Sequence, residues 1–317
     1  MQLFKEGLQP GVIRKTAIHS RNSRKQHYQL WLMVLPAVAV ILIFNYIPMY
    51  GVQLAFREYD FAKGLTGGEW VGLKYFEQFM GGPLFGDLMR NTFVISFFTI
   101  LAGFPAPIIL ALLFNQVKIR WVKKTLQTTV YLPHFISLVV MVGLLNVLLS
   151  PNTGILGQAL SRLGLGEINL LANTRTFVSV YVLSDVWQHA GWNSIIYLAA
   201  LSGVDPQLYD AAKIDGANKW QIIRYVDFPA LVPTMIILLI LNMGGILNTG
   251  FEKIFLMQNP LNLPVSEVIS TYTYKIGILS NQFSYSTAIG LFNTLINFIF
   301  LVITNLIARR HSEHSLW

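Results

Sequence analysis

Long runs of apolar residues, separated by shorter polar segments, dominate this chain. A helix that crosses a membrane needs about 20 mostly apolar residues. Six stretches meet this requirement, and one spanning helix is predicted for each: Leu30–Phe56, Leu88–Phe114, Val130–Leu149, Phe177–Leu201, Ala230–Asn248 and Tyr285–Ala308. The predicted fold class is therefore an all-α integral membrane protein with six transmembrane helices. Four prolines lie inside the first two spans, at positions 36, 48, 105 and 107, and they predict kinks buried against neighbouring helices rather than broken spans.

The composition agrees with a membrane protein. Of the 317 residues, 54% are hydrophobic and 12% are charged, whereas a soluble chain carries about 25% charged residues. The net charge is +8, but the basic residues are too unevenly placed for a nucleic-acid groove, so no nucleic-acid partner is expected. The absence of cysteine excludes disulfides and thiolate metal sites, and the histidines lack ligand spacing, so no metal site is expected.

The distribution of positive charge predicts the orientation. Most of the lysine and arginine residues fall in the N-terminal arm and in the segments that follow the second, fourth and sixth predicted spans. Cytoplasmic segments of membrane proteins carry this excess. We therefore expect both termini in the cytoplasm, a basic arm over residues 1–27 that contacts anionic lipid, and a transmembrane domain over residues 28–317.

The segment 205–229, between the fourth and fifth predicted spans, is polar and has clear helix signals. Asp205 is suited to cap a helix N-terminus and Pro206 to occupy the first turn. A short helix is therefore expected over Gln207–Ile214. Gly216 then permits a sharp reversal of the backbone that a side chain would obstruct.

A second short helix is expected over Asn218–Val226. It should end before Phe228, because the residue that precedes a proline disfavours helical backbone angles. Two short helices hinged at a glycine form a compact projection that fits a cleft in a partner protein. The alternative is an ordinary helix-turn-helix that lies on the membrane surface.

The same segment resembles the cytoplasmic EAA loop of ATP-binding-cassette (ABC) importer permeases. The shared pattern is an acidic residue, two alanines, a glycine four residues later and a hydrophobic-x-hydrophobic-proline close. Asp210 stands where the family usually has glutamate, a carboxylate longer by one methylene. The resemblance implies a loop that couples transport to a separate ATPase through Tyr209, Asp210, Ala211, Ala212, Lys213, Asp215, Gly216, Ala217 and Pro229.

Other segments resemble MalF-like sugar permeases and, more specifically, their LplB-like polysaccharide branch. They are residues 47–51, 70–76, 91–92, 250–256, 270–274, 290–292 and 304–305. This branch is implicated in the import of oligosaccharides from plant and algal polysaccharides, and the resemblance extends to the permeases of alginate importers. It implies the type I ABC importer permease fold, a bacterial inner-membrane location and an oligosaccharide substrate that includes acidic sugars.

The resemblance also implies the partners: a second, homologous permease subunit in a heterodimer, two ATPase subunits that hold ATP and Mg, and an extracytoplasmic solute-binding protein. This chain has no G-x-x-x-x-G-K-[ST], H-E-x-x-H or G-x-S-x-G sequence, so it is expected to bind no cofactor and to be no enzyme itself. One alternative is an ion-coupled secondary sugar transporter, whose paired interrupted helices are not found. The other is a membrane enzyme that acts on lipid-linked saccharide.

Polar residues inside the fourth predicted span are candidates for the substrate pathway. Asp185, Gln188, His189 and Trp192 share one helix face, with Asn193 alongside. An ionised side chain at the bilayer centre costs about 2.5–3.5 kcal/mol, so Asp185 should face a polar cavity or a partner. These side chains suit sugar hydroxyls and sugar faces. The alternative is hydrogen bonding between helices of the permease dimer.

Polar residues elsewhere in the chain complete the candidates. The fifth span offers pathway candidates at Asn242, Gly245, Thr249 and Glu252. The polar positions of the second span are interpreted as helix-packing groups: Thr92, Ser96, Thr99 and Gly103. Those of the sixth span are interpreted in the same way, with the substrate pathway as the alternative: Asn293, Asn297 and Thr304. Tyr272 and Tyr274 are interpreted as interfacial anchors, or as contacts for the docked binding protein.

Overall fold

The computed structural model describes residues 23–65, 67–160, 162, 169–248, 250–311 and 315. These residues are mostly helical, and within them the only β-structure is two isolated bridges, Arg57 with Trp70 and Asp60 with Gly64. The predicted all-α class is confirmed. The chain divides into two compact units, Met1–Val52 and Gln53–Trp317. Most of the predicted basic arm lies outside the described residues, and its boundary at residue 27 stays a prediction.

The described part of the first unit is an apolar helical stretch. It comprises α1 (Ser23–Ile41), a π-helical turn (Leu42–Tyr46) and α2 (Ile47–Met49), and a 3₁₀ segment (Tyr50–Phe56) continues across the boundary. The predicted span Leu30–Phe56 is confirmed, and none of its most apolar window is buried. An apolar helix without packing of its own is stable only in contact with lipid or another protein.

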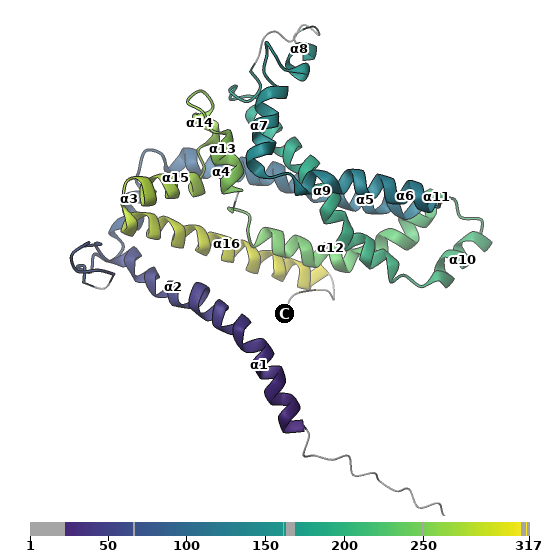
Figure 1. The fold of residues 1–317 in the computed structure, drawn as a ribbon, viewed down its shortest axis with the longest axis horizontal. Helices are drawn as coiled ribbons and strands as arrows, with labels where there is room; N and C mark the ends of the chain where they lie inside the picture. The colour runs from purple at the N-terminus through teal and green to yellow at the C-terminus, as the bar shows by residue number, and fades with distance from the viewer. Residues whose placement is uncertain are drawn as a thin grey trace, which may run out of the picture. The chain divides into compact units, whose positions relative to one another are not determined.

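The second unit holds the remaining helices. They are α3 (Lys74–Met80), α4 (Phe85–Gly103), α5 (Pro105–Gln116), α6 (Arg120–Tyr131), α7 (Leu138–Leu148), α8 (Ile155–Leu160), α9 (Phe177–Ser202), α10 (Pro206–Ile214), α11 (Lys219–Ile222), α12 (Phe228–Met243), α13 (Phe251–Met257), α14 (Leu263–Ser266), α15 (Ile269–Tyr274) and α16 (Phe283–His311). In Figure 1, α5 and α6 run beside α9, and α12 runs beside α16. The long helices thus form a bundle with α9 at its centre.

Three apolar clusters hold this bundle together. One joins α4, α7, α9 and α13 around Ile95 and Tyr181. A second joins α5, α9 and α12 around Ala111 and Leu231. The third packs α3, α15 and α16 around Ile289. Because α9 contributes to two of the clusters, its polar residues are held in fixed positions relative to the neighbouring helices.

Four stretches of the described chain are long and apolar enough to cross a membrane: Leu30–Phe56, Phe85–Gln116, Lys219–Met243 and Phe283–Arg310. The bent α6–α7 pair is a fifth if it counts as one span. The predicted fourth span is present as the 26-residue α9, which is about 39 Å long. Its polar residues lower its hydropathy, so it is not among these stretches, and the count of six stays a prediction.

The predicted span Val130–Leu149 is not one helix, and this expectation was wrong. A 3₁₀ turn, Leu132–Phe135, separates α6 from α7, and the two helices are bent by 99°. Pro133 lacks a backbone donor, and the Ser137 hydroxyl accepts a hydrogen bond from the Val140 N–H at 3.4 Å, which starts α7. Hydropathy alone did not reveal these stop and start signals.

The expected helix end before Phe228 was also wrong. A π-helical turn, Ile223–Asp227, joins α11 to α12 without a break, and Phe228 has helical angles of φ −64° and ψ −46°. The Phe228 N–H bonds to the Ile223 carbonyl, five residues back. Pro229, which has no N–H to donate, follows directly after this wider turn.

The helices α9 and α6 approach each other closely. Gly191 lies there, and a Cβ added to it would overlap the backbone carbonyl of Val130. A residue without a side chain is therefore required for this close approach of the two helices.

Candidate functional site

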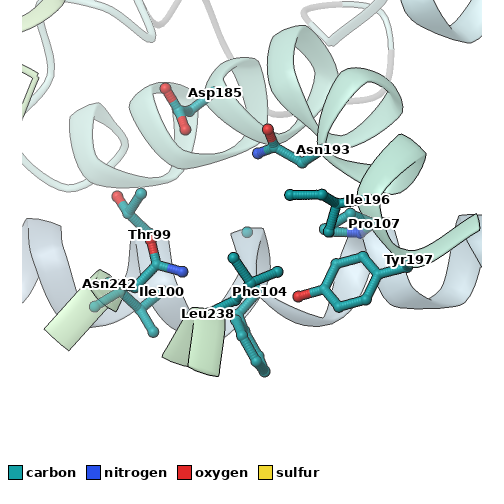
Figure 2. A pocket seen from close by; sticks show the side chains of 11 residues that line it. Thr99, Ile100, Phe104, Pro107, Asp185, Asn193, Ile196, Tyr197, Leu238 and Asn242 are labelled. Carbon is teal, nitrogen blue, oxygen red and sulfur yellow. The ribbon is translucent and has the colours of Figure 1, made fainter. Parts of the chain in front are cut away.

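A cavity of about 290 Å³ lies between α4–α5, α9 and α12. Figure 2 shows Asp185 and Asn193 on α9, with Thr99 and Asn242 on the opposite side. The Tyr197 side chain also lines this space. Hydroxyl, amide and carboxylate groups from three long helices thus meet around one space, which is the arrangement expected for a polar ligand in a membrane protein.

A second cavity of about 190 Å³ shares Thr99, Asp185 and Asn242 with the first. Ser96 and Tyr181 line this second space. The Ser96 hydroxyl is buried and has no hydrogen-bond partner among the described residues. The polar wall therefore continues along α4 and α9 beyond the first cavity.

Asp185 is the central charge of this wall. The Lys253 ammonium donates to the Asp185 carboxylate at 3.2 Å and to the Tyr181 carbonyl oxygen at 3.2 Å. The Lys253 nitrogen also lies 4.8 Å from the centre of the Tyr181 ring, a cation–π distance. The His189 Nδ1 is 3.4 Å from the Asp185 carboxylate. These contacts compensate charges that would otherwise be costly inside a membrane protein.

Several predicted pathway residues gather here. Asp185, Asn193 and Asn242 line the cavity, and His189 is adjacent. The Trp192 ring stacks on His134 with ring centres 4.6 Å apart and an interplanar angle of 2°. Contact with a substrate stays a prediction for each of them.

The remaining pathway candidates lie elsewhere. Gln188 is buried, and its amide donates to the Ile136 carbonyl oxygen at 3.0 Å, so it supports the bend between α6 and α7. Gly245 lines the second cavity. Glu252 is exposed at the start of α13. Thr249 lies outside the described residues. The cavities are therefore lined by fewer of the candidates than expected.

The interpretation of the second span as packing was partly wrong. Thr92 does pack: its hydroxyl donates to the Leu88 carbonyl oxygen at 2.7 Å and accepts from the Ile269 N–H at 3.0 Å. Thr99 and Gly103, on the same face, line the first cavity instead. Helical spacing identified which residues share this face. It did not show that Thr92 meets the backbone of a neighbouring element, whereas Thr99 and Gly103 face open space.

Sequence reasoning missed Lys253. It is the residue after Glu252 in the segment 250–256 that supported the family resemblance, and it takes the buried position. A lone lysine close to an apolar span was the available signal, since a buried charge in a membrane protein needs a partner.

Two polar residues of α16, Asn293 and Asn297, behave as packing groups, as interpreted. The Asn297 carbonyl oxygen accepts from the Leu247 N–H at 2.9 Å, and its amide donates to Asn248 at 3.1 Å. Asn293 donates to the same Asn248 oxygen at 3.1 Å. Thr304 is half-buried on the same helix. Asn293 and Asn297 thereby hold the backbone that follows α12.

The two candidate tyrosines of α15 are half-buried. Tyr274 packs against Phe251 and Phe255, with ring centres 5.1 Å and 5.3 Å apart. Tyr272 packs with the apolar cluster that contains Ile289. Their contact with a binding protein stays a prediction.

The loop 205–229 has the predicted beginning and hinge. The Asp205 carboxylate accepts from the Gln207 N–H at 2.9 Å and caps α10. Gly216 has a φ of +75°, a conformation that favours glycine. Asn218 and Gln221 form a capping box at the start of α11. Figure 1 shows α10 beyond the ends of α5 and α12.

Most predicted coupling residues are exposed or half-buried on this loop. The Asp210 carboxylate accepts from Lys213 at 2.8 Å, and both side chains are exposed. Ala211, Asp215, Gly216 and Pro229 are also exposed, while Ala212 and Ala217 are half-buried. Large apolar side chains also face outward, among them Ile214 at 86% exposure and Trp220 at 71%. A loop with this surface is available for a partner protein.

Tyr209 connects α10 to the segment that leads into α12. It is half-buried, and its hydroxyl donates to the Asp227 carboxylate at 2.7 Å. Burial, together with this hydrogen bond, raises the pKa of Tyr209 to about 12. The phenol is therefore a neutral donor throughout the physiological pH range.

Comparison with protein families and curated proteins places these features in context. Residues 103–313 match the family described as "Binding-protein-dependent transport system inner membrane component". The chain is 41% identical to the polygalacturonan/rhamnogalacturonan transport system permease protein YteP of Bacillus subtilis (strain 168), over 92% of this chain and 91% of that protein. It is 38% identical to the protein LplB of the same organism, over 92% of each chain.

Two solved structures are similar in fold. A bacterial ABC transporter involved in the import of the acidic polysaccharide alginate contains a chain with a TM-score of 0.83 and 38% identity, over 92% of this chain and 98% of that one. The bacterial alginate ABC transporter in complex with alginate pentasaccharide-bound periplasmic protein gives a TM-score of 0.84 and 37% identity, over 94% and 99%.

Proposed function

This chain belongs to the family of inner membrane components of binding-protein-dependent transport systems, and from that membership we propose that it carries acidic oligosaccharides into the cytoplasm. It is a multi-pass ABC permease subunit of the inner membrane rather than an ion-coupled transporter. In the proposed assembly it pairs with a second, homologous permease subunit, two ATPase subunits that hold ATP and Mg, and an extracytoplasmic binding protein.

The observation that carries the coupling part of the proposal is the loop α10–α11. It projects beyond α5 and α12, turns at Gly216 with a φ of +75°, and exposes Ile214 and Trp220. Such a projection suits a cleft on an ATPase subunit. We place this loop and both termini in the cytoplasm, in agreement with the positive charges around them.

The substrate class has support from the relatives and from the cavity. Polygalacturonan and alginate both carry a carboxylate on their sugar units, and two similar proteins are named for them. The cavity offers Thr99, Asn193 and Asn242 to sugar hydroxyls. The charge of Asp185 is compensated by Lys253 at 3.2 Å, so a carboxylate on the sugar does not meet an unpaired negative charge.

The proposed cycle follows from these two regions. A loaded binding protein docks on the extracytoplasmic side and releases the sugar toward the cavity. Closure of the ATPase dimer moves α10, and the spans alternate between outward-open and inward-open states. In α5 and α12, the sugar thus binds near one end and the ATPase acts near the other end.

Uptake by a reconstituted transporter tests the proposal. Proteoliposomes would contain this chain, its partner permease, the ATPase and the binding protein, with ATP inside. We expect ATP-dependent uptake of labelled oligogalacturonate or oligoalginate, and little uptake of an uncharged oligosaccharide of the same length. Uptake driven by an imposed ion gradient without ATP, or preference for the uncharged sugar, would contradict it.

A further inference from the structure

Asp227 is a fully buried carboxylate at the base of the coupling loop. Its exposed fraction is 0%. One carboxylate oxygen accepts from the Tyr209 hydroxyl at 2.7 Å and from the Asn115 amide at 3.1 Å. The other accepts from the Gln116 amide at 2.8 Å. We call these four residues the Asp227 knot.

The knot has an unusual charge balance. Within the part of the chain that the structure describes, no lysine, arginine or histidine lies within ion-pair distance of Asp227. Its three protein donors are all neutral. A buried carboxylate is costly unless hydrogen bonds satisfy it, so each donor is held firmly in place.

The knot joins three separate elements. Asn115 and Gln116 are the last residues of α5, Tyr209 lies in the middle of α10, and Asp227 closes the π-helical turn that leads into α12. π-helical turns often occur at functional positions in helices. Two long helices and the coupling loop therefore meet at one carboxylate.

Apart from Tyr209, α10 makes little contact with the bundle. The helix contains no buried residue, and Gly216, with a φ of +75°, forms the hinge on its C-terminal side. Tyr209 and Asp227 lie 18 residues apart and on either side of this hinge. Their hydrogen bond closes the base of the loop, so displacement of α10 is not absorbed by rotation at Gly216.

We propose that Asp227 is a positioning residue that passes the movement of α10 to α5 and α12 together. This inference rests on the proposed function, since it concerns the link between the ATPase and the spans. A transporter that lacks the knot still assembles and hydrolyses ATP. The movement driven by ATP then displaces α10 without displacing α5 and α12 together.

The test compares variants in the full transporter, reconstituted with its partner subunits and binding protein. Tyr209→Phe removes only the hydroxyl, and Asp227→Asn removes the charge and leaves one acceptor oxygen in place of two. We expect either change to raise the ATP hydrolysed per sugar transported by about tenfold, the effect of losing a hydrogen bond to a charged group.

Two further variants make the result specific. Asp227→Asn combined with Gln116→Glu exchanges donor and acceptor across the same contact, and should return the ratio toward that of the wild type. Tyr225→Phe is the matched control, because Tyr225 lies on the same π-helical turn but is 67% exposed. It should leave the ratio unchanged.

The outcomes separate the inference from the proposed function. A purely structural role for the knot lowers uptake and ATP hydrolysis in proportion, and an unchanged ratio in Tyr209→Phe and Asp227→Asn would overturn the inference alone. Failure of the exchanged pair to restore the ratio would also count against it. A wild-type transporter without ATP-driven uptake would overturn the proposed function, and the inference with it.

Discussion

The ammonium of Lys253 lies 3.2 Å from a carboxylate oxygen of Asp185, across 68 residues of sequence. This contact joins α13 to α9 beside the cavities, and the Tyr181 ring covers the lysine. The pair places two opposite charges where the bundle is otherwise lined by neutral polar and apolar groups. The two charges together, rather than either charge alone, therefore determine the local field at the cavities.

Lys253→Met should destabilise the protein, because among the described residues it leaves only His189 beside the half-buried charge of Asp185. Removal of one partner of a fully buried ion pair costs about 3–5 kcal/mol, and the half-buried Asp185 makes the cost here smaller. Replacement of both partners by neutral groups is often close to neutral. We therefore expect the midpoint of thermal unfolding in detergent to fall in Lys253→Met and to recover in the double variant with Asp185→Asn. No recovery would contradict this account of the pair.

The same variants should change the preference for charge in the sugar. An unpaired Asp185 in the cavity wall repels a uronate carboxylate, so Lys253→Met should lower uptake of acidic oligosaccharide per assembled transporter by about tenfold, a cost of about 1.4 kcal/mol. Adding Asp185→Asn should restore most of the uptake. The measurement is initial uptake in proteoliposomes, normalised to inserted protein. Equal loss for the single and double variants would exclude the electrostatic explanation.

Gly216→Val should weaken coupling through backbone strain rather than a clash. The φ of +75° at Gly216 disfavours other residues, and a Cβ there would meet nothing within 4 Å. A non-glycine residue in this conformation costs about 1–2 kcal/mol, and more when it is β-branched. Sugar uptake and transport-linked ATP hydrolysis should both fall while membrane insertion persists. Gly216→Asn, which tolerates this conformation, should retain most activity, and an equal effect of both changes would refute the strain argument.

Gly191→Ala should separate α9 from α6. The added methyl overlaps the Val130 carbonyl, and such overpacking typically costs about 1–3 kcal/mol. Thermal unfolding in detergent should therefore shift to lower temperature. Gly143→Ala in α7 is the matched control, because nothing lies within 4 Å of its added Cβ, and it should be tolerated. If both variants unfold at the wild-type temperature, the two helices do not depend on the close approach.

The contribution of Tyr209 should not depend on pH near neutrality. Its pKa is raised from 10.0 to about 12, so folding favours the neutral phenol. The associated stability is complete below the unfolded pKa of about 10 and is lost as the pH rises through about 12. The difference in ATP hydrolysed per sugar between wild type and Tyr209→Phe should stay constant from about pH 6 to about pH 9. A difference that disappears within that range would show that another group controls the contact.

Local signals were sufficient for much of the architecture. The apolar run Leu30–Phe56 is a helix over the expected residues. Asp205 caps α10 and Gly216 provides the reversal, as the residue types indicated. These features depend on neighbours within a few residues, through side-chain caps, backbone preferences and hydrophobic length, so the printed order of residues contains the necessary information.

The site itself depended on contacts that no local pattern contains. Spacing along α9 correctly grouped Asp185 with His189, but Lys253 comes from α13, and Gln188 turns to the bend between α6 and α7. Asp227 likewise finds its donors on α5 and α10. The sequence alone determined which residues share a helix face. Only the tertiary structure decided what each face meets, because a buried charge or amide takes its partner from whichever distant helix packs beside it.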